Sequence, residues 1–131
     1  MSVCVVFKEG KCEDALKYYC DVFNLNVPKI TRYSSFEDNH YPKDIRNRIY
    51  KSTLDILGST IYLSDSINDD IVDVGNNFYI VIKMNKDKLF DCYRKFEKDS
   101  IIKAEPQKID GKVCTRLIDK FGISWQFMTR N

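Results

Sequence analysis

The stretch IYKSTLDILGSTIYL at residues 49–63 recurs in outline 64 positions later as VCTRLIDKFGISWQF at residues 113–127. The aspartate and the glycine of the first stretch fall on Asp119 and Gly122 of the second, and the apolar positions line up. Each stretch holds two runs of strand-forming residues around its glycine, which is typical of a β-hairpin. The sequence therefore contains an internal repeat, which predicts one hairpin in each half of the chain.

The segments before the first hairpin predict a strand, a helix and a second strand. Residues 2–7 are rich in valine and phenylalanine, which favours a buried strand. Residues 13–23 carry apolar side chains at helical spacing, with two acidic residues in the first turn. Residues 27–33 can form a short strand, and the polar residues 34–47 are predicted to be a loop. With the hairpin included, the order of elements in this half is βαβββ.

The same order recurs in the second half. Residues 65–75, rich in Asn and Asp, are predicted to connect the halves. Residues 78–84 then predict a strand, and Asn85 is placed to cap the helix that follows. Residues 101–109 contain Pro106, which favours an edge strand because proline cannot donate a backbone hydrogen bond. The final hairpin completes a second βαβββ unit.

We therefore expect an α+β fold with two βαβββ modules, residues 1–66 and 75–131, within a single domain. Side chains alternate along a strand, so each hairpin presents an apolar face and a mixed face. In the last strand, Trp125 and Phe127 lie on the apolar face and Gln126 on the mixed one. If the helices cover the apolar faces, the mixed faces of two curved sheets are left to line a cleft for a small molecule.

The charge balance argues against nucleic acid as a partner. The 21 basic and 19 acidic residues give a net charge of +2 and are interspersed, whereas phosphate binding needs a concentrated basic face. No apolar run approaches the ~20 residues that a bilayer span needs, and the N-terminal run is too short for a signal peptide. We therefore expect no nucleic-acid partner, no membrane association and a cytoplasmic location.

The cysteine pattern predicts reduced thiols. Their odd count and the absence of a CxxC spacing fit neither a disulfide framework nor a zinc knuckle. We expect most of them to be buried as small hydrophobic side chains. They are Cys4, Cys12, Cys20, Cys92 and Cys114.

Three segments resemble a known superfamily. They are ALKYY with VF at residues 15–23, GSTIYLSD at residues 58–65, and above all DKFGISW at residues 119–125. Through them the chain resembles the vicinal-oxygen-chelate superfamily of glyoxalases, bleomycin-resistance proteins and extradiol dioxygenases, and within it the PhnB-like branch. The resemblance implies the paired βαβββ fold, with curved mixed sheets around a cleft, and a homodimer.

The resemblance also implies a divalent metal, but this sequence departs from the ligand pattern. The family's ligand glutamate falls on Gln126, the matching place in the first half is Tyr62, and a histidine common in the PhnB-like branch falls on Lys51. Neither Tyr62 nor Gln126 supplies a carboxylate, and a lysine ammonium has no lone pair. The single histidine, His40, is in the predicted loop. We therefore expect no metal and no cofactor.

The interpretation that follows is a metal-free small-molecule-binding protein. Lys51 would supply positive charge to the ligand, and four other side chains would supply hydrogen bonds. The expected ligand-binding residues are Lys51, Thr53, Tyr62, Thr115 and Gln126.

Three alternatives remain open at this point. The chain could be a metal-dependent lyase, isomerase or dioxygenase whose ligands lie elsewhere. It could be an enzyme without metal that uses Cys114 or Lys51, although no partner base is indicated by the spacing. It could also be a structural or regulatory dimer without a ligand. The fold alone does not choose between them.

Overall fold

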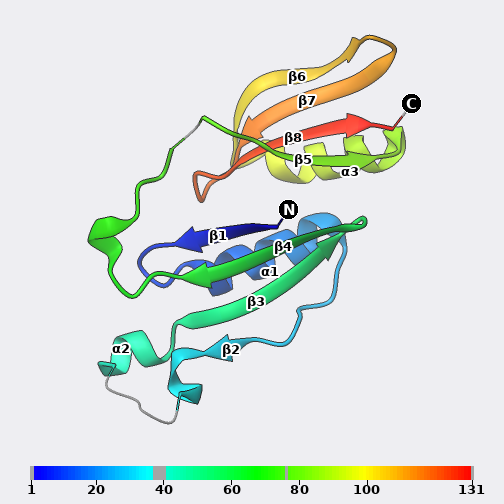
Figure 1. The fold of residues 1–131 in the computed structure, drawn as a ribbon. Coiled ribbons are helices and arrows are strands. Elements are labelled where there is room, and N and C mark those ends of the chain that lie inside the picture. Colours follow the sequence, from blue (N-terminus) through cyan, green and yellow to red (C-terminus); the bar gives the residue numbers. More distant parts are fainter. Residues whose placement is uncertain (1, 37–40, 76, 131) are drawn as a thin grey trace. The chain divides into compact units, whose positions relative to one another are not determined.

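The computed structural model describes residues 2–36, 41–75 and 77–130 of the chain (Figure 1). The chain divides into two compact units, Met1–Asp73 and Val74–Asn131. Each unit has its own sheet and its own helix against that sheet, and each is described separately below.

The first unit contains one four-stranded sheet with the strand order β1-β4-β3-β2. Its elements are β1 (Val3–Phe7), α1 (Cys12–Phe23), β2 (Thr31–Arg32), η1 (Tyr33–Ser35), α2 (Lys43–Arg46), β3 (Ile49–Ile56), β4 (Ser59–Asp65) and η2 (Asp69–Ile71). β1 runs parallel to β4, and the other neighbours are antiparallel. The parallel pair is possible because α1 provides the long connection that two parallel strands need.

The second unit repeats this topology with the strand order β5-β8-β7-β6. Its elements are β5 (Ile80–Met84), α3 (Lys86–Glu97), β6 (Ile101–Ile109), β7 (Lys112–Ile118) and β8 (Ser124–Thr129). β5 is parallel to β8, and the remaining pairs are antiparallel. The predicted α+β fold with two βαβββ modules is confirmed.

Three predicted segments differ in detail from the observed ones. The strand expected at 27–33 shrinks to β2, because only Thr31 and Arg32 pair with β3. The expected loop at 34–47 contains η1 and α2, and the buried side chain of Ile45 holds α2 in place. His40 lies outside the described residues. The strand expected at 78–84 begins at Ile80, where its pairing with β8 begins.

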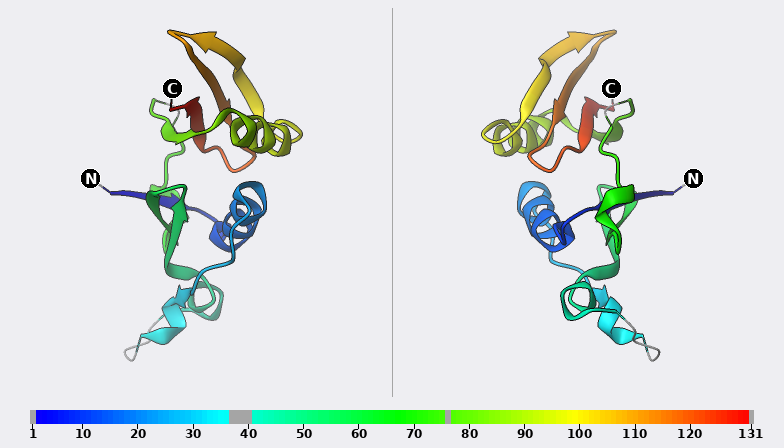
Figure 2. Two further views of the ribbon diagram at one scale, coloured as in Figure 1. Left: turned by 90° about the vertical axis from the view of Figure 1, so that its right-hand side faces the viewer. Right: turned by 90° about the vertical axis from the view of Figure 1, so that its left-hand side faces the viewer.

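In the first unit, α1 lies against one face of the sheet, as both views of Figure 2 show. The sheet contributes Leu54, Ile61 and Leu63 to this core, each no more than 4% exposed. The buried side chains of α1 are Cys12, Ala15, Leu16, Tyr19, Cys20, Val22 and Phe23. Burying a large apolar side chain stabilises a fold by about 1.5–3 kcal/mol. The apolar side chains that make residues 13–23 amphipathic therefore pack α1 against the sheet.

Asp65 fixes the start of α1 although it was expected to begin the connector between the halves. It is the last residue of β4, is 2% exposed, and its carboxylate accepts the N–H groups of Cys12 (2.9 Å) and Ile49 (2.8 Å). The N-cap residue Lys11 makes no side-chain bond to the helix, so Asp65 satisfies one of the free N–H groups. Burial raises the pKa of the Asp65 carboxyl despite these bonds.

In the second unit, the core is built around three aromatic rings. The Phe96 ring of α3 has its centroid 5.8 Å from that of Trp125 and 5.7 Å from that of Phe127. All three side chains are at most 1% exposed. At the start of α3, the Asn85 side chain accepts the Lys88 N–H at 2.8 Å, which confirms the predicted N-cap. Pro106 lies in the edge strand β6, as predicted.

The repeat has a different offset in the two strands of each hairpin. Tyr62 pairs with Thr53, whereas Gln126, 64 residues after Tyr62, pairs with Arg116, which is 63 residues after Thr53. The second turn has five residues between its strands and the first has two, so one offset cannot serve both strands. A change of one residue moves a side chain to the opposite face. The predicted offset of 64 therefore holds for β4 and β8 and is wrong for β3 and β7.

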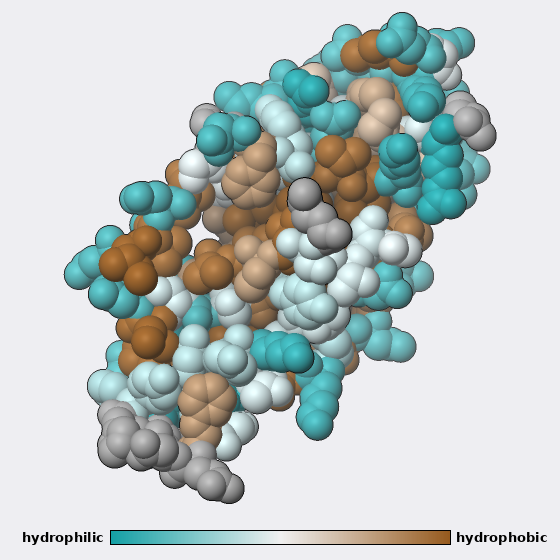
Figure 3. Space-filling model, viewed as in Figure 1, coloured by the Kyte–Doolittle hydropathy of each residue, from teal (hydrophilic) through white to brown (hydrophobic). Residues whose placement is uncertain are grey.

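Apolar side chains also reach the surface on the edge strands. Val3 and Val6 of β1 are 37% and 43% exposed, and Val81 of β5 is 44% exposed. On the face drawn in Figure 3, hydrophobic residues reach the surface among hydrophilic ones. None of the helices described is long and apolar enough to cross a membrane.

Candidate functional site

The sheet of the first unit has an open face on the side away from α1. Along β4, Ile61 and Leu63 face the helix, so Tyr62 and Ser64 belong to the open face and are half-buried. β1 adds Cys4, which pairs with Tyr62. β3 adds Thr53, which pairs with Tyr62 from the other side. Cys4, Tyr62 and Thr53 therefore form one row across three strands.

A cavity of about 360 Å³ lies on this open face. It brings together two of the residues expected to bind a ligand, Lys51 and Tyr62. Its lining residues are Cys4, Tyr50, Lys51, Ser52, Tyr62, Leu63 and Ser64. Its size is within the range of small-molecule sites. Thr53 is next to Tyr62 on the same face but is not among the described lining residues of the cavity.

Tyr50 is a cavity residue that sequence reasoning missed. Thr31 pairs with Lys51 and Arg32 pairs with Ile49, which leaves Tyr50 as the extra residue of a β-bulge. A bulge redirects side chains, so Tyr50 and Lys51 are both exposed although they are consecutive. Only the pairing with β2 reveals the bulge, and the alternation of β3 alone gives no signal for it.

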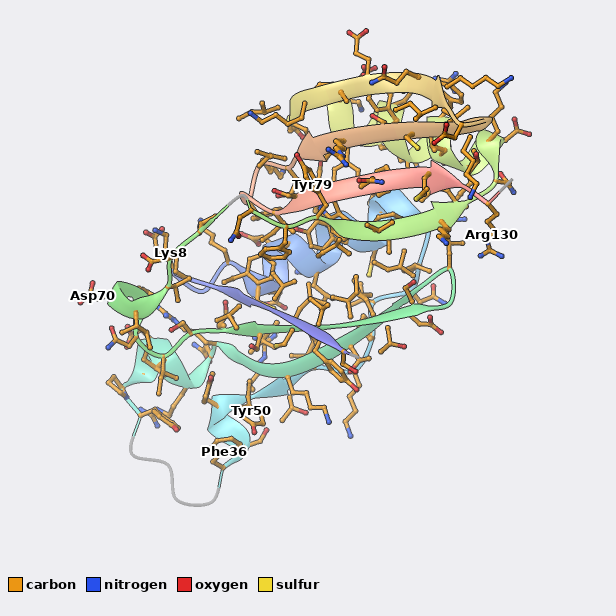
Figure 4. The ribbon with its side chains drawn as sticks, turned by 45° about the horizontal axis from the view of Figure 1, so that its top comes forward. Lys8, Phe36, Tyr50, Asp70, Tyr79 and Arg130 are labelled. Atoms are coloured by element: carbon orange, nitrogen blue, oxygen red, sulfur yellow. The ribbon has the colours of Figure 1, made fainter. Side chains whose placement is uncertain are left out.

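Tyr50 is also part of an aromatic cluster beside the cavity. Its ring centroid is 4.8 Å from that of Phe36 and 5.5 Å from that of Tyr33, and both pairs meet edge to face. Tyr41 extends the cluster, with its ring 5.2 Å from Tyr33. Figure 4 shows Tyr50 and Phe36 together at the β2 end of the sheet. These contacts hold the Tyr50 ring as a wall of the cavity while leaving 46% of the residue exposed.

In the second unit, the corresponding open face presents Gln126 and Arg116. The Arg116 Nε donates a hydrogen bond of 2.8 Å to the Gln126 Oε1. The guanidinium carbon of Arg116 lies 4.8 Å from the centroid of the Tyr79 ring, just ahead of β5 (Figure 4). The Gln126 amide nitrogen is 3.7 Å from the Met128 sulfur. Arg116 therefore occupies the place on this face that Thr53 holds in the first sheet.

Thr115 is not on an open face, contrary to its prediction as a ligand-binding residue. It is 1% exposed, and its hydroxyl donates to the Ala104 carbonyl at 2.7 Å. Its structural counterpart is Ser52, which is also buried and donates to the Leu63 carbonyl at 2.8 Å. Both hydroxyls satisfy strand carbonyls on the helix side of their sheets. The physical reason is the offset of 63 in this strand, which turns Thr115 inward and Arg116 outward.

The residues at the expected metal positions do not fit a metal centre. Tyr62 has no carboxylate, and the Gln126 oxygen already accepts a hydrogen bond from the cationic Arg116. A guanidinium this close opposes a divalent cation through charge repulsion. Among the described residues, no three His, Cys, Asp or Glu side chains are placed to hold a metal ion.

A larger polar cavity, of about 580 Å³, lies elsewhere in the first unit. Two arginines line it, and each already has an acidic partner. The Arg32 Nη2 lies 2.9 Å from the Glu13 carboxylate, and the Arg48 Nη1 lies 2.8 Å from that of Asp69. These bonds lower the pKa of both carboxyls. We assign this cavity a structural role, because both of its arginines are held in ion pairs beside the start of α1.

The thiols follow the predicted pattern in part. Cys12, Cys20 and Cys92 are buried, Cys114 is half-buried and Cys4 is exposed, and no disulfide joins them in the described residues. Cys114 lies on the open face of the second sheet, where its pairing with Met128 places it.

Comparison with known proteins identifies the family. A family model described as 3-demethylubiquinone-9 3-methyltransferase matches residues 1–128. The chain belongs to this family. As the sequence predicts, the chain has the fold of a PhnB protein and of a glyoxalase/bleomycin-resistance protein. No curated protein matches the chain in sequence.

Solved structures share the fold of this family member at low sequence identity. A protein from Bacillus cereus, described as a putative 3-demethylubiquinone-9 3-methyltransferase and PhnB protein, is 19% identical with a TM-score of 0.77, and the match covers 98% of each chain. A glyoxalase/bleomycin resistance protein from Albidiferax ferrireducens T118 is 13% identical with a TM-score of 0.66, covering 98% of this chain and 97% of that one. The fosfomycin resistance protein FosX from Listeria monocytogenes is 11% identical with a TM-score of 0.61, covering 100% and 92%.

Proposed function

We propose that this chain is a metal-independent small-molecule-binding protein of the glyoxalase/bleomycin-resistance superfamily. The observation that carries the proposal is the cavity of about 360 Å³ on the open face of the first sheet. It gathers Tyr50, Lys51 and Tyr62 from strands that the fold holds rigidly side by side.

The chemistry of the lining selects the class of ligand. Lys51 offers an ammonium with three donors, which favours an anionic group. Tyr62 offers a phenolic hydroxyl that can donate or accept. The Tyr50 ring, fixed by its aromatic neighbours, offers a surface on which a planar ligand can stack. A small aromatic or anionic molecule matches all three groups.

The donor set supports binding without a metal. The positions that carry ligands in metal-dependent relatives hold Tyr62 and Gln126 here, and Gln126 is bonded to Arg116. A metal-dependent lyase, isomerase or dioxygenase needs at least three suitable ligands around an open position. This proposal therefore predicts far less than one bound metal ion per chain when the protein is purified without chelators. Stoichiometric nickel, zinc, manganese or iron would replace it with the metal-dependent alternative.

We also propose a cytoplasmic location and a homodimer. The absence of a disulfide among the five cysteines supports a reducing compartment. The exposed apolar side chains of β1 and β5 support a second copy as the partner.

Ligand binding can be tested by thermal shift and calorimetry. The panel should contain small aromatic acids and phosphonates, including fosfomycin, because one structural neighbour is named for resistance to it. We expect at least one compound to raise the melting temperature. Lys51→Ala should weaken its binding about tenfold, the size expected for losing a hydrogen bond from a charged group. Tyr62→Phe should weaken it by a smaller factor.

Matched controls separate the cavity from general effects. Lys103→Ala removes an exposed strand lysine in the other unit, and Tyr93→Phe removes a half-buried tyrosine hydroxyl on α3. Neither should change the affinity. A panel without hits, or hits that Lys51→Ala and Tyr62→Phe leave unchanged, would favour a dimer without a ligand.

A further inference from the structure

Arg116 is held on two sides and open on a third. Its Nε is fixed by the Gln126 Oε1 at 2.8 Å, and its planar face lies over the Tyr79 ring at 4.8 Å. Within the described part of the chain, no hydrogen bond or ion pair engages its two terminal nitrogens. The residue is exposed. The guanidinium is thus oriented by the protein while the edge that carries Nη1 and Nη2 is available.

A second group on the same face lacks a partner. The Ser124 side chain is 4% exposed, and its Oγ has no hydrogen-bond partner among the described residues. A buried hydroxyl without a hydrogen bond is unfavourable, so such a group indicates a missing partner. Ser124 is two residues before Gln126 on β8 and therefore shares its face.

The register places these two groups as diagonal neighbours. Gln126 pairs with Arg116, and Ser124 pairs with Ile118 on the same two strands. Diagonal neighbours on one face of an antiparallel pair are about 7 Å apart between their backbones, within reach of a long side chain and one small ligand. Tyr79, which directly precedes the Ile80–Trp125 pair, closes the same end of the face.

We propose that Arg116 and Ser124 form an oxyanion-binding subsite on the open face of the second sheet. This inference goes beyond the proposed function, because the subsite belongs to the second unit and the cavity beside Lys51 belongs to the first. A guanidinium edge presents two parallel N–H groups, which match two oxygens of a carboxylate, phosphonate or phosphate. The Ser124 hydroxyl donates to an oxygen of the same group. Gln126 and Tyr79 act as positioning residues, because they hold the guanidinium rather than the anion.

Anion binding at this subsite should be stronger with arginine than with lysine at position 116. A lysine at position 116 keeps the charge but loses the fork and the stacking on Tyr79. Titrations with methylphosphonate, inorganic phosphate and benzoate at constant ionic strength, followed by the NMR signal of the Arg116 Nε–H group, measure binding directly. We expect saturable shifts with the native protein. Arg116→Gln and Arg116→Lys, followed through neighbouring amide signals, should weaken binding about tenfold and severalfold, respectively.

Ser124→Ala provides an independent readout. Without anion, its melting temperature should equal or exceed that of the native protein, because the variant removes a buried hydroxyl that has no partner. The increase in melting temperature caused by the anion should become smaller. A lower melting temperature without anion, together with an unchanged anion effect, would mean that Ser124 has only a structural role and would overturn the subsite.

The matched control is Arg94→Lys. Arg94 is also exposed and lies over an aromatic ring, Phe90, at 5.9 Å, but on α3. Equal losses for Arg94→Lys and Arg116→Lys would show a general charge effect and overturn the inference. Binding of an organic ligand that requires Lys51, without any anion binding that requires Arg116, would also overturn it while preserving the proposed function. Phosphate binding that requires Arg116, with no ligand for the Lys51 cavity, would preserve the subsite and reject that function.

Discussion

Cys4 and Cys92 should differ in reactivity because one side chain is exposed and the other is buried. Cys4 is exposed on β1, whereas Cys92 of α3 is fully buried. Burial raises the pKa of the Cys92 thiol to about 11, and burial together with the nearby Asp65 carboxyl raises that of Cys12 further. Since the thiolate is the reactive form, a raised pKa lowers the reactive fraction at any pH below it. Two factors therefore lower the reactivity of these buried thiols: a reagent cannot reach them, and they remain protonated.

This difference predicts an order of alkylation. At pH 8, iodoacetamide should modify Cys4 first, and Cys12 and Cys92 only when the protein is unfolded with denaturant. Peptide mass spectrometry with time gives the order. Cys4→Ser should remove the fast phase and leave the rest unchanged. Equal rates for Cys4 and Cys92 in the native protein would contradict the burial of Cys92 between α3 and its sheet.

At the scale of elements, the hairpin between β7 and β8 depends on one carboxylate. The Asp119 Oδ1 accepts the N–H groups of Phe121 (2.9 Å) and Ile123 (3.0 Å), and its Oδ2 accepts the Trp125 indole N–H (2.9 Å). Gly122 permits the turn with a φ of +84°. This network gives a physical reason for the spacing Asp-x-Phe-Gly-x-x-Trp.

Asp119→Asn should destabilise the protein by about 2 kcal/mol, because an amide group replaces one of the two acceptor oxygens and leaves a buried donor unsatisfied. Urea unfolding followed by Trp125 fluorescence measures this change. The control is Asp55→Asn, at the aspartate that matches Asp119 in the repeat but is exposed on β3. It should change the free energy of unfolding by less than about 0.5 kcal/mol. Equal effects would show that the network does not stabilise the turn.

The elements also show what the sequence could predict. Alternation of apolar residues placed Tyr62 and Gln126 on open faces correctly, because β4 and β8 are regular strands with one face against a helix. Alternation could not predict that Thr115 faces the helix and Arg116 the open face, because these faces depend on the length of the turn between β7 and β8. The exposure of Tyr50 depends on a bulge opposite β2, which is a non-local feature. Local patterns therefore predicted the fold and the faces on which part of the candidate site lies.

At the scale of the whole molecule, the two units share one topology, and the first strand of each is an edge strand that pairs with only one neighbour in its own sheet. These edges, β1 and β5, carry the exposed valines Val3, Val6 and Val81. Natural proteins usually cover such an edge or place charges on it. The exposed apolar edges support a second copy of the chain as their cover.

Light scattering should therefore give a mass of twice 15.4 kDa. A lysine at an edge valine, in Val6→Lys or Val81→Lys, should shift the mass toward the monomer, because a charge would have to be buried in the interface. Val27→Lys changes a valine of similar exposure in a loop and should leave the dimer intact. A monomer at every concentration, or a loss of the dimer in Val27→Lys as well, would count against this assembly.

The unequal turns of the two hairpins have a consequence for engineering. A designer who introduces a metal-binding histidine or glutamate in one half and its counterpart in the other must align each strand separately, with an offset of 64 after the turn and 63 before it. A graft made with one offset would deliver the new side chain to the hydrophobic interior at position 115, beside Leu117 and Phe127. Placing matching functional side chains in the two halves of this chain therefore requires that the residues of each hairpin turn be counted first.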